Sequence, residues 1–204
     1  NPVCAGASVI FTATPVNGGT IPGYQWKVNG TNVAGATNST YSFIPGNGNT
    51  ISCALTSSES CTTGNPATSN TMTMTVTQLL LIGSISANQT ICANTIPAQL
   101  TGLAPLNGTL PTYQWQSSLN NNTFTNINGA TSLNYQPGLL SSTTYYRQMQ
   151  NTVGTCGGPL PTNTLTMTVT PLLVVGSISA NQTICANTIP AQLIGTAPLN
   201  GTLP

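Results

Sequence analysis

Cysteine is the residue type whose chemistry this sequence offers most plainly. The chain of 204 residues contains six of them: Cys4, Cys53, Cys61, Cys92, Cys156 and Cys185. No two form a CxxC pair and the chain has no histidine, so a zinc site would have to be built from widely spaced cysteines alone. Disulfide bonds are the better interpretation, and they imply an oxidising, extracellular setting. Buried free thiols are the alternative.

Charged side chains, which most enzymes need, are almost absent. Lys27, Arg147 and Glu59 are the three charged residues of the chain. Two cations cannot neutralise a run of phosphates, which argues against nucleic-acid binding. One carboxylate supplies neither a calcium site nor a glycosidase pair, and a Ser-His-Asp triad lacks its histidine and its aspartate. We therefore expect no catalytic residue, no metal site and no cofactor, but a structural, adhesive or passive binding role.

The apolar residues are too dispersed for a membrane span, because the longest apolar run is Leu79–Ile82. The formal net charge of +1 gives little electrostatic repulsion between copies, which favours self-association. With so few titrating groups, the melting temperature should stay flat from about pH 3 to about pH 8.

Internal repetition organises the chain. The segment Gly83–Pro111 recurs as Gly176–Pro204 with two differences, and the period is 93 residues, measured from Cys92 to Cys185. Self-similarity of this kind indicates an array of domains.

A more diverged copy lies upstream, where Tyr24-Gln-Trp26 matches Tyr113-Gln-Trp115. We predict three domains: repeat 1 (1–78), without its leading strand; repeat 2 (79–171); and the first two strands of repeat 3 (172–204). Two explanations of the incomplete ends remain open. The sequence is a window cut from a longer array, or its orphan strands complete the deficient domain of a neighbouring chain. The first is simpler.

Alternation of apolar and polar residues predicts β-strands. It is visible in Tyr24–Val28, Thr71–Thr77 and Thr144–Met149, and Ser8–Thr14 is rich in β-branched and aromatic residues, which also favour strands. No window shows helical periodicity, and Asn-Gly turns punctuate the chain. About seven short strands per repeat indicate an all-β fold of tandem immunoglobulin-like antiparallel β-sandwich repeats.

Three kinds of residue are candidates for the cores. Trp26 and Trp115 stand where a tryptophan of strand C packs between the sheets. Cys53 occupies the usual inter-sheet cysteine position of strand F, but its partner position holds Ala13, so we expect a free buried thiol. Tyr145 stands at the start of strand F, as in a tyrosine corner.

The motifs Tyr113–Ser118, Thr123–Thr131 and Gly154–Cys156 closely resemble the Ig-like (PKD-like) repeats of giant surface adhesins of gliding bacteria that use type IX secretion. Asn1–Val9 and Tyr24–Gly30 look like a sister type. The resemblance implies an exported, multi-repeat protein of the cell surface. It does not distinguish between stalks, spacers and fibres.

Immunoglobulin topology bears on the disulfide pairing. It puts Cys92, in the A′–B turn, and Cys156, in the F–G loop, at opposite ends of a strand of seven residues, about 23 Å long. A disulfide needs Cα atoms within about 7 Å. We slightly favour Cys4–Cys156, between repeats, with Cys92 and Cys185 bonding later repeats and Cys61 an earlier one. An intradomain Cys92–Cys156 bond stays open if the F–G segment folds back.

Surface chemistry offers weaker candidates. Asn-X-Ser/Thr sequons occur at Asn29, Asn38, Asn88, Asn107, Asn121, Asn181 and Asn200, and most such matches arise by chance in a chain rich in Asn and Thr. Tyr41 and Tyr146 are candidates for exposed rings that stack on a sugar, although core packing is favoured for both.

The sequence therefore predicts a structural, non-catalytic repeat module of an extracellular filament or adhesin stalk, whose partners are other repeats or other copies of the chain. An Ig-like module that binds surface glycans or a protein is the alternative.

Overall fold

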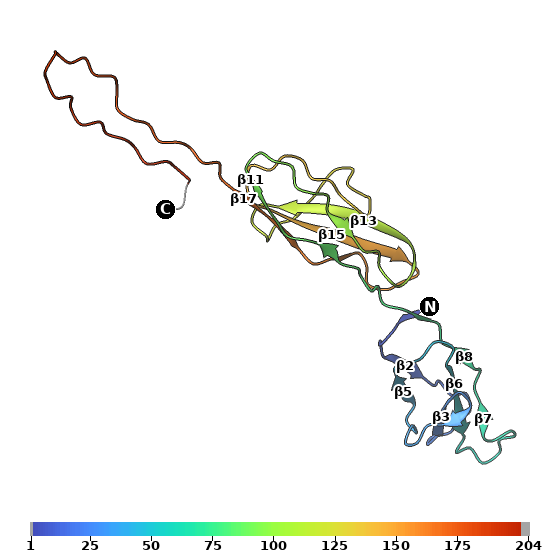
Figure 1. Cartoon of the computed structure of the whole chain (residues 1–204). Coiled ribbons are helices and arrows are strands. Elements are labelled where there is room, and N and C mark those ends of the chain that lie inside the picture. The colour runs from blue at the N-terminus through green and yellow to red at the C-terminus, as the bar shows by residue number, and fades with distance from the viewer. Residues whose placement is uncertain (1, 201–204) are drawn as a thin grey trace. The chain divides into compact units, whose positions relative to one another are not determined.

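The computed structural model describes residues 2–200 and is all-β (Figure 1). No described residue belongs to a helix that could cross a membrane. The predicted fold class, β-sandwiches, is confirmed. The last four residues of predicted repeat 3 lie outside the described residues. The chain forms two compact units, and the first joins the chain up to Ile82 with two segments of repeat 2, Pro105–Thr112 and Gln150–Leu160.

Repeat 1 packs two sheets around a small core. One sheet pairs β2 with β5, and the other has the order β4-β3-β6-β7, with β8 also paired to β6. The strands are β2 (Val9–Thr12), β3 (Gly23–Val28), β4 (Thr31–Asn32), β5 (Thr40–Phe43), β6 (Thr50–Thr56), β7 (Ala67–Thr68) and β8 (Met72–Thr73).

The core of repeat 1 contains the predicted tryptophan and cysteine. Trp26 on β3 lies opposite Cys53 on β6, and both are 4% exposed. Alternation along β6 turns Ile51 inward with Cys53. Phe11 from the facing sheet and Met74 complete the cluster.

The predicted strand over 71–77 is wrong in one respect, because it is interrupted at Met74. There the backbone N–H of Met74 donates to the Asn49 carbonyl, and the Met74 carbonyl accepts from Gly48 N–H. The chain then leaves β6 and pairs in parallel with the N-terminal strand. These two strands are β1 (Val3–Cys4) and β9 (Val76–Thr77).

Repeat 2 has a larger sheet of order β11-β17-β15-β13-β14, with β16 paired to β15. A smaller sheet pairs β10 with β12. The strands are β10 (Ile85–Ser86), β11 (Gln89–Cys92), β12 (Thr101–Gly102), β13 (Thr109–Ser118), β14 (Thr125–Asn126), β15 (Thr144–Val153), β16 (Leu160–Pro161) and β17 (Leu165–Thr170). The core residues are Ile85, Leu100, Trp115, Ala130, Tyr146, Leu165 and Met167.

The phase of β15 corrects one prediction. Its even-numbered residues face inward, so Tyr146 is 4% exposed in the core while Tyr145 is half-buried opposite Thr166. The core tyrosine is therefore Tyr146, not Tyr145. Neither Tyr146 nor Tyr41 is therefore an exposed ring that could stack on a sugar. Tyr41 is half-buried and stacks on Trp26 at 5.9 Å between ring centroids.

Beyond Thr170 the chain is extended and every described residue is exposed. Two isolated bridges, Val174↔Leu199 and Ile178↔Gly195, join the two arms of this segment. No strand is assigned to this segment among the described residues, so the predicted first two strands of repeat 3 stay a prediction; the segment is the open hairpin drawn in red-brown in Figure 1.

Candidate functional site

The local backbone holds Cys4 at the end of β1. Val3 N–H donates to Thr75 O at 2.9 Å and Ala5 N–H to Thr77 O at 2.8 Å. The chain then turns away through Gly6, whose φ of +82° suits glycine best. The Cys4 side chain therefore projects from a short strand that is hydrogen-bonded to β9.

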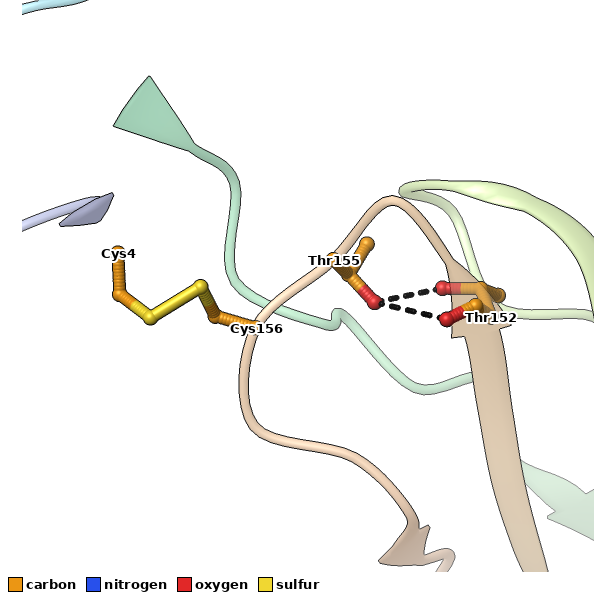
Figure 2. Close-up of a disulfide and its surroundings, with 4 residues drawn as sticks. All are labelled: Cys4, Thr152, Thr155 and Cys156. Carbon is orange, nitrogen blue, oxygen red and sulfur yellow. Dashed lines mark hydrogen bonds between the residues drawn. A yellow bond between two sulfur atoms is a disulfide. The ribbon is translucent and has the colours of Figure 1, made fainter. Parts of the chain in front are cut away.

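The loop after β15 positions Cys156. The Thr152 and Thr155 hydroxyls are hydrogen-bonded at 2.7 Å, and the Thr155 hydroxyl also donates to Thr152 O, as Figure 2 shows. Gly154 and Gly157, both at positive φ, flank the cysteine. These bonds give the loop a fixed bend beside the sulfur.

The backbone of Cys156 bonds to the segment that follows β9. Cys156 N–H donates to Gln78 O at 2.9 Å, and Leu80 N–H donates to Cys156 O at 2.8 Å. A second loop of repeat 2 contacts the same segment, since the Asn107 amide donates to Leu79 O. The stretch Thr75–Leu80 is therefore the common template that brings the two cysteines together.

Cys4 and Cys156 form a disulfide bond with a Cα–Cα distance of 5.7 Å (Figure 2). The separation lies in the normal range for disulfides. The inter-repeat pairing is thus the one present, and Cys92, the other candidate partner of Cys156, is a free exposed thiol. The bond spans 152 residues of sequence.

The remaining cysteines divide into two groups. Cys53 is free and buried, and its burial raises the pKa of the thiol, which keeps it protonated. Cys61 and Cys185, like Cys92, are free and exposed. Among the described residues no three His, Cys, Asp or Glu side chains cluster as metal ligands.

The sequons differ in how their side chains are used. Four asparagine side chains are hydrogen-bonded to backbone groups: Asn29, Asn88, Asn107 and Asn200. Asn38, Asn121 and Asn181 are exposed.

A second feature of repeat 1 is a cleft of about 370 Å³, which sequence reasoning missed. Its floor includes the core residues Phe11, Trp26 and Cys53, and its rim includes Ala13 and Asn70. The sequence did mark one residue of this cleft. Asn70, on its rim, opens an Asn-Thr-X-Thr-Met-Thr-Val-Thr motif, and Asn163 opens the matching motif of repeat 2.

The chain is similar to known proteins in two of three comparisons. Residues 81–171 match a family model described as a domain of unknown function (DUF8696). No curated protein matches the chain. Among solved structures it is similar to the fibronectin(III)-like modules of Clostridium thermocellum CbhA, with 9% identity and a TM-score of 0.37 over 83% of this chain and 89% of that one. It is also similar to the FN1–FN3 domains of chicken CNTN1, with 12% identity and a TM-score of 0.34 over 81% of this chain and 64% of that one.

Proposed function

We propose that this chain is a structural, non-catalytic module of an extracellular filament or adhesin stalk, in which disulfides carry tension from one repeat to the next. The observation that carries the proposal is the Cys4–Cys156 bond. An oxidised disulfide favours an extracellular setting. The scarcity of charged residues supports a passive role and close association between copies.

The position of the bond determines which residues bear a load. When the chain is pulled from outside the two cysteines, tension passes from Cys4 directly to Cys156 and bypasses the residues between them. Those residues can unfold but cannot lengthen the module. At about 3.4 Å per extended residue, the disulfide prevents the extension of about 500 Å of contour length, which corresponds to the separation of 152 residues.

The exposed thiols extend the same scheme to an array. Cys61 in repeat 1 corresponds by its place to Cys156, and Cys92 and Cys185 correspond to Cys4. Each repeat would therefore offer one cysteine to the preceding repeat and one to the following repeat. Disulfides at successive junctions would limit the extension of the whole stalk.

Single-molecule force spectroscopy tests the proposal directly. The 204-residue chain would be tethered at its two ends, in a variant with Cys61, Cys92 and Cys185 changed to Ser so that other pairings are excluded. We expect the oxidised chain to release only the residues outside the disulfide loop, and a reductant to add about 500 Å of contour length.

The matched control adds Cys4→Ser and Cys156→Ser to the same background. It should show the full contour length without reductant. Full extension of the oxidised parent before reduction would overturn the proposal, because the disulfide would then carry no load.

A further inference from the structure

The outer face of the larger sheet of repeat 2 carries the arginine of the chain. Alternation along β15 turns Tyr146 and Gln148 into the core and leaves Tyr145, Arg147 and Met149 half-buried on the opposite face. β15 lies between β17 and β13 in this sheet. Arg147 therefore stands on a strand that is paired along both edges, which holds its backbone in place.

Two contacts fix the guanidinium of Arg147. Its Nε–H donates to Gln116 Oε1 at 2.7 Å, and its central carbon lies 4.1 Å from the centroid of the Phe124 ring. The Gln116 side-chain amide in turn donates to Asn126 Oδ1 at 2.7 Å. One contact holds an edge of the guanidinium and the other holds its face, so the side chain is oriented before any ligand binds.

The loop that presents Phe124 is ordered by the side chain of Asn120. Asn120 Oδ1 accepts the backbone N–H groups of Asn122 and Thr123, both at 2.9 Å. It also accepts the Ser118 hydroxyl at 2.9 Å. These bonds close the loop between β13 and β14 directly before Phe124. The phenyl ring is therefore held by its own loop and provides a fixed surface for the guanidinium.

Arg147 keeps hydrogen-bonding capacity that the fold does not use. The N–H groups of its terminal nitrogens have no hydrogen-bond partner among residues 2–200. Glu59 is the single acidic residue of the chain, and within the described residues no ion pair joins it to Arg147. A guanidinium engaged at Nε still presents its terminal nitrogens side by side, which is an edge that carboxylates bind through both oxygens. The site therefore fits a carboxylate.

Two neighbours of Arg147 favour a sugar as the carrier of that carboxylate. Tyr145 lies on the same face, about 7 Å along the strand, and its ring offers an apolar surface to a pyranose. Asn126 is exposed, and its side-chain N–H groups, which have no partner in the described part of the chain, can donate to hydroxyls. A carboxylate, an apolar ring face and hydroxyls occur together in uronic acids.

We propose that the outer face of repeat 2 binds an acidic polysaccharide. A uronate carboxylate accepts hydrogen bonds from the terminal nitrogens of Arg147, a sugar ring lies against Tyr145, and hydroxyls of the next sugar bond to Asn126. The inference goes beyond the mechanical role proposed above and does not depend on the Cys4–Cys156 bond.

Repeat 1 shows the same face without this site. Its cation, Lys27, pairs across the sheet with Ser52 on β6 and with Asn32 on β4. Among residues 2–200 the Lys27 ammonium has neither a hydrogen bond nor an aromatic ring beside it. An unrestrained ammonium attracts anions weakly and without a fixed direction. Lys27 therefore provides the matched control for Arg147, with equal charge and no orientation.

The test uses the 204-residue chain with Cys61, Cys92 and Cys185 changed to Ser, so that no intermolecular disulfide forms. Trigalacturonate is added to the ¹⁵N-labelled protein, and nuclear magnetic resonance follows the Nε–H of Arg147 and the side-chain amide of Asn126. We expect both signals to shift saturably. The fully methyl-esterified trimer, which has the same sugars without the charges, should cause no shift.

Substitutions separate a built site from general attraction. Arg147→Gln should weaken binding roughly tenfold or more, and Arg147→Lys and Tyr145→Ala should each weaken it about threefold or more. Lys27→Gln should leave the dissociation constant within about twofold, because that cation is not part of the site. Urea unfolding followed by Trp115 fluorescence checks that each variant of repeat 2 remains folded.

Three results would overturn the proposal. The first is the absence of a saturable shift, and the second is an equal loss of affinity on Lys27→Gln and Arg147→Gln, which would mean attraction to charge alone. The third is binding of hexaglutamate as tight as that of trigalacturonate with no effect of Tyr145→Ala on either, which would make an acidic peptide the ligand. None of these results affects the force measurement, which depends on Cys4–Cys156.

Discussion

Repeats 1 and 2 share one internal frame and close it in different ways. In both, the core tryptophan donates its indole N–H to a backbone carbonyl, Asn38 O for Trp26 and Ser132 O for Trp115. In both repeats the glutamine before the tryptophan donates its side-chain amide to two backbone carbonyls. One is the carbonyl of the tryptophan itself, and the other is that of Val33 in repeat 1 or Ile127 in repeat 2. These bonds join residues close in sequence, so each repeat can build this part alone.

The difference lies in the contacts that join distant residues. Repeat 2 has Ile85 held by Asn163, 78 residues away, and a continuous last strand, β17. Repeat 1 has an open cleft and a last strand split into β8 and β9. The comparison teaches that both repeats share the tryptophan frame, while β10 and its Ile85 close the core of repeat 2.

Removing each tryptophan should have the largest effect. Trp115→Ala should lower the free energy of unfolding of repeat 2 by about 3–5 kcal/mol. Trp115 is fully buried, whereas Trp26 borders the cleft, so Trp26→Ala should cost repeat 1 an amount near the lower end of that range. Urea unfolding followed by circular dichroism measures both. Equal losses would show that the cleft does not weaken the core of repeat 1.

Truncating Ile85, whose side chain anchors β10 in the core, should make the core of repeat 2 resemble that of repeat 1. Ile85→Ala should destabilise repeat 2 by about 2–4 kcal/mol, because the side chain is buried in the core and leaves a cavity. Trp115 fluorescence in a Trp26→Phe background follows this repeat alone, since the chain has two tryptophans.

The sequence supplies the matched control, Ile178→Ala, in the same local sequence but at an exposed position. It should change stability by less than about 0.5 kcal/mol. If Ile85→Ala were equally mild, β10 would not be what closes the core of repeat 2.

Features that depend on local pattern could be predicted from the sequence. Alternation located β3 and β15, and the Tyr-Gln-Trp motif located both core tryptophans. The phase of β15 was harder, because two adjacent tyrosines offer an aromatic ring to either face. The inward face also carries the polar residues Gln148 and Gln150, so hydrophobicity alone could not set the phase.

Features that depend on distant partners could not be predicted in this way. The break at Met74 comes from hydrogen bonds to the turn at Gly48 and Asn49. Immunoglobulin topology favours the observed Cys4–Cys156 bond, but the alternative Cys92–Cys156 bond stays open at that stage, because the hydrogen bonds of Thr75–Leu80 that bring Cys4 and Cys156 together join residues distant in sequence.

The inter-sheet position of the F strand gives a smaller contrast, since it holds Gln148 in repeat 2 and Cys53 in repeat 1. The Gln148 amide donates to the carbonyls of Ser132 and Leu133, and the residue is fully buried. Gln148→Ala should therefore cost about 2–3 kcal/mol, from lost bonds and a cavity. Cys53→Ala removes one sulfur beside a cleft and should cost about 1 kcal/mol.

Denaturant unfolding of the two variants, followed through the tryptophan of the affected repeat, measures this pair of losses. A larger loss for Cys53→Ala than for Gln148→Ala would mean that the thiol is packed more tightly than the cleft beside it allows.

The smallest effect at neutral pH should come from Tyr146→Phe, and it becomes visible only in alkali. Burial, with a further contribution from the charge of Tyr135, raises the pKa of Tyr146 to about 12. Between about pH 10 and pH 12 the unfolded chain therefore loses the proton while the folded chain keeps it, so stability falls as pH rises. At the corresponding place repeat 1 has Ile51, which does not titrate. The comparison is made in a Cys53→Ala background, because burial raises the pKa of the Cys53 thiol and its titration would also destabilise repeat 1 in alkali. We expect alkali to unfold repeat 2 before repeat 1, and Tyr146→Phe to remove most of that difference while leaving stability at pH 7 within about 0.5 kcal/mol.

Fluorescence of single-tryptophan variants over the alkaline range measures each repeat separately. Parallel loss in both repeats would place the titrating group elsewhere and remove the buried tyrosine from the comparison.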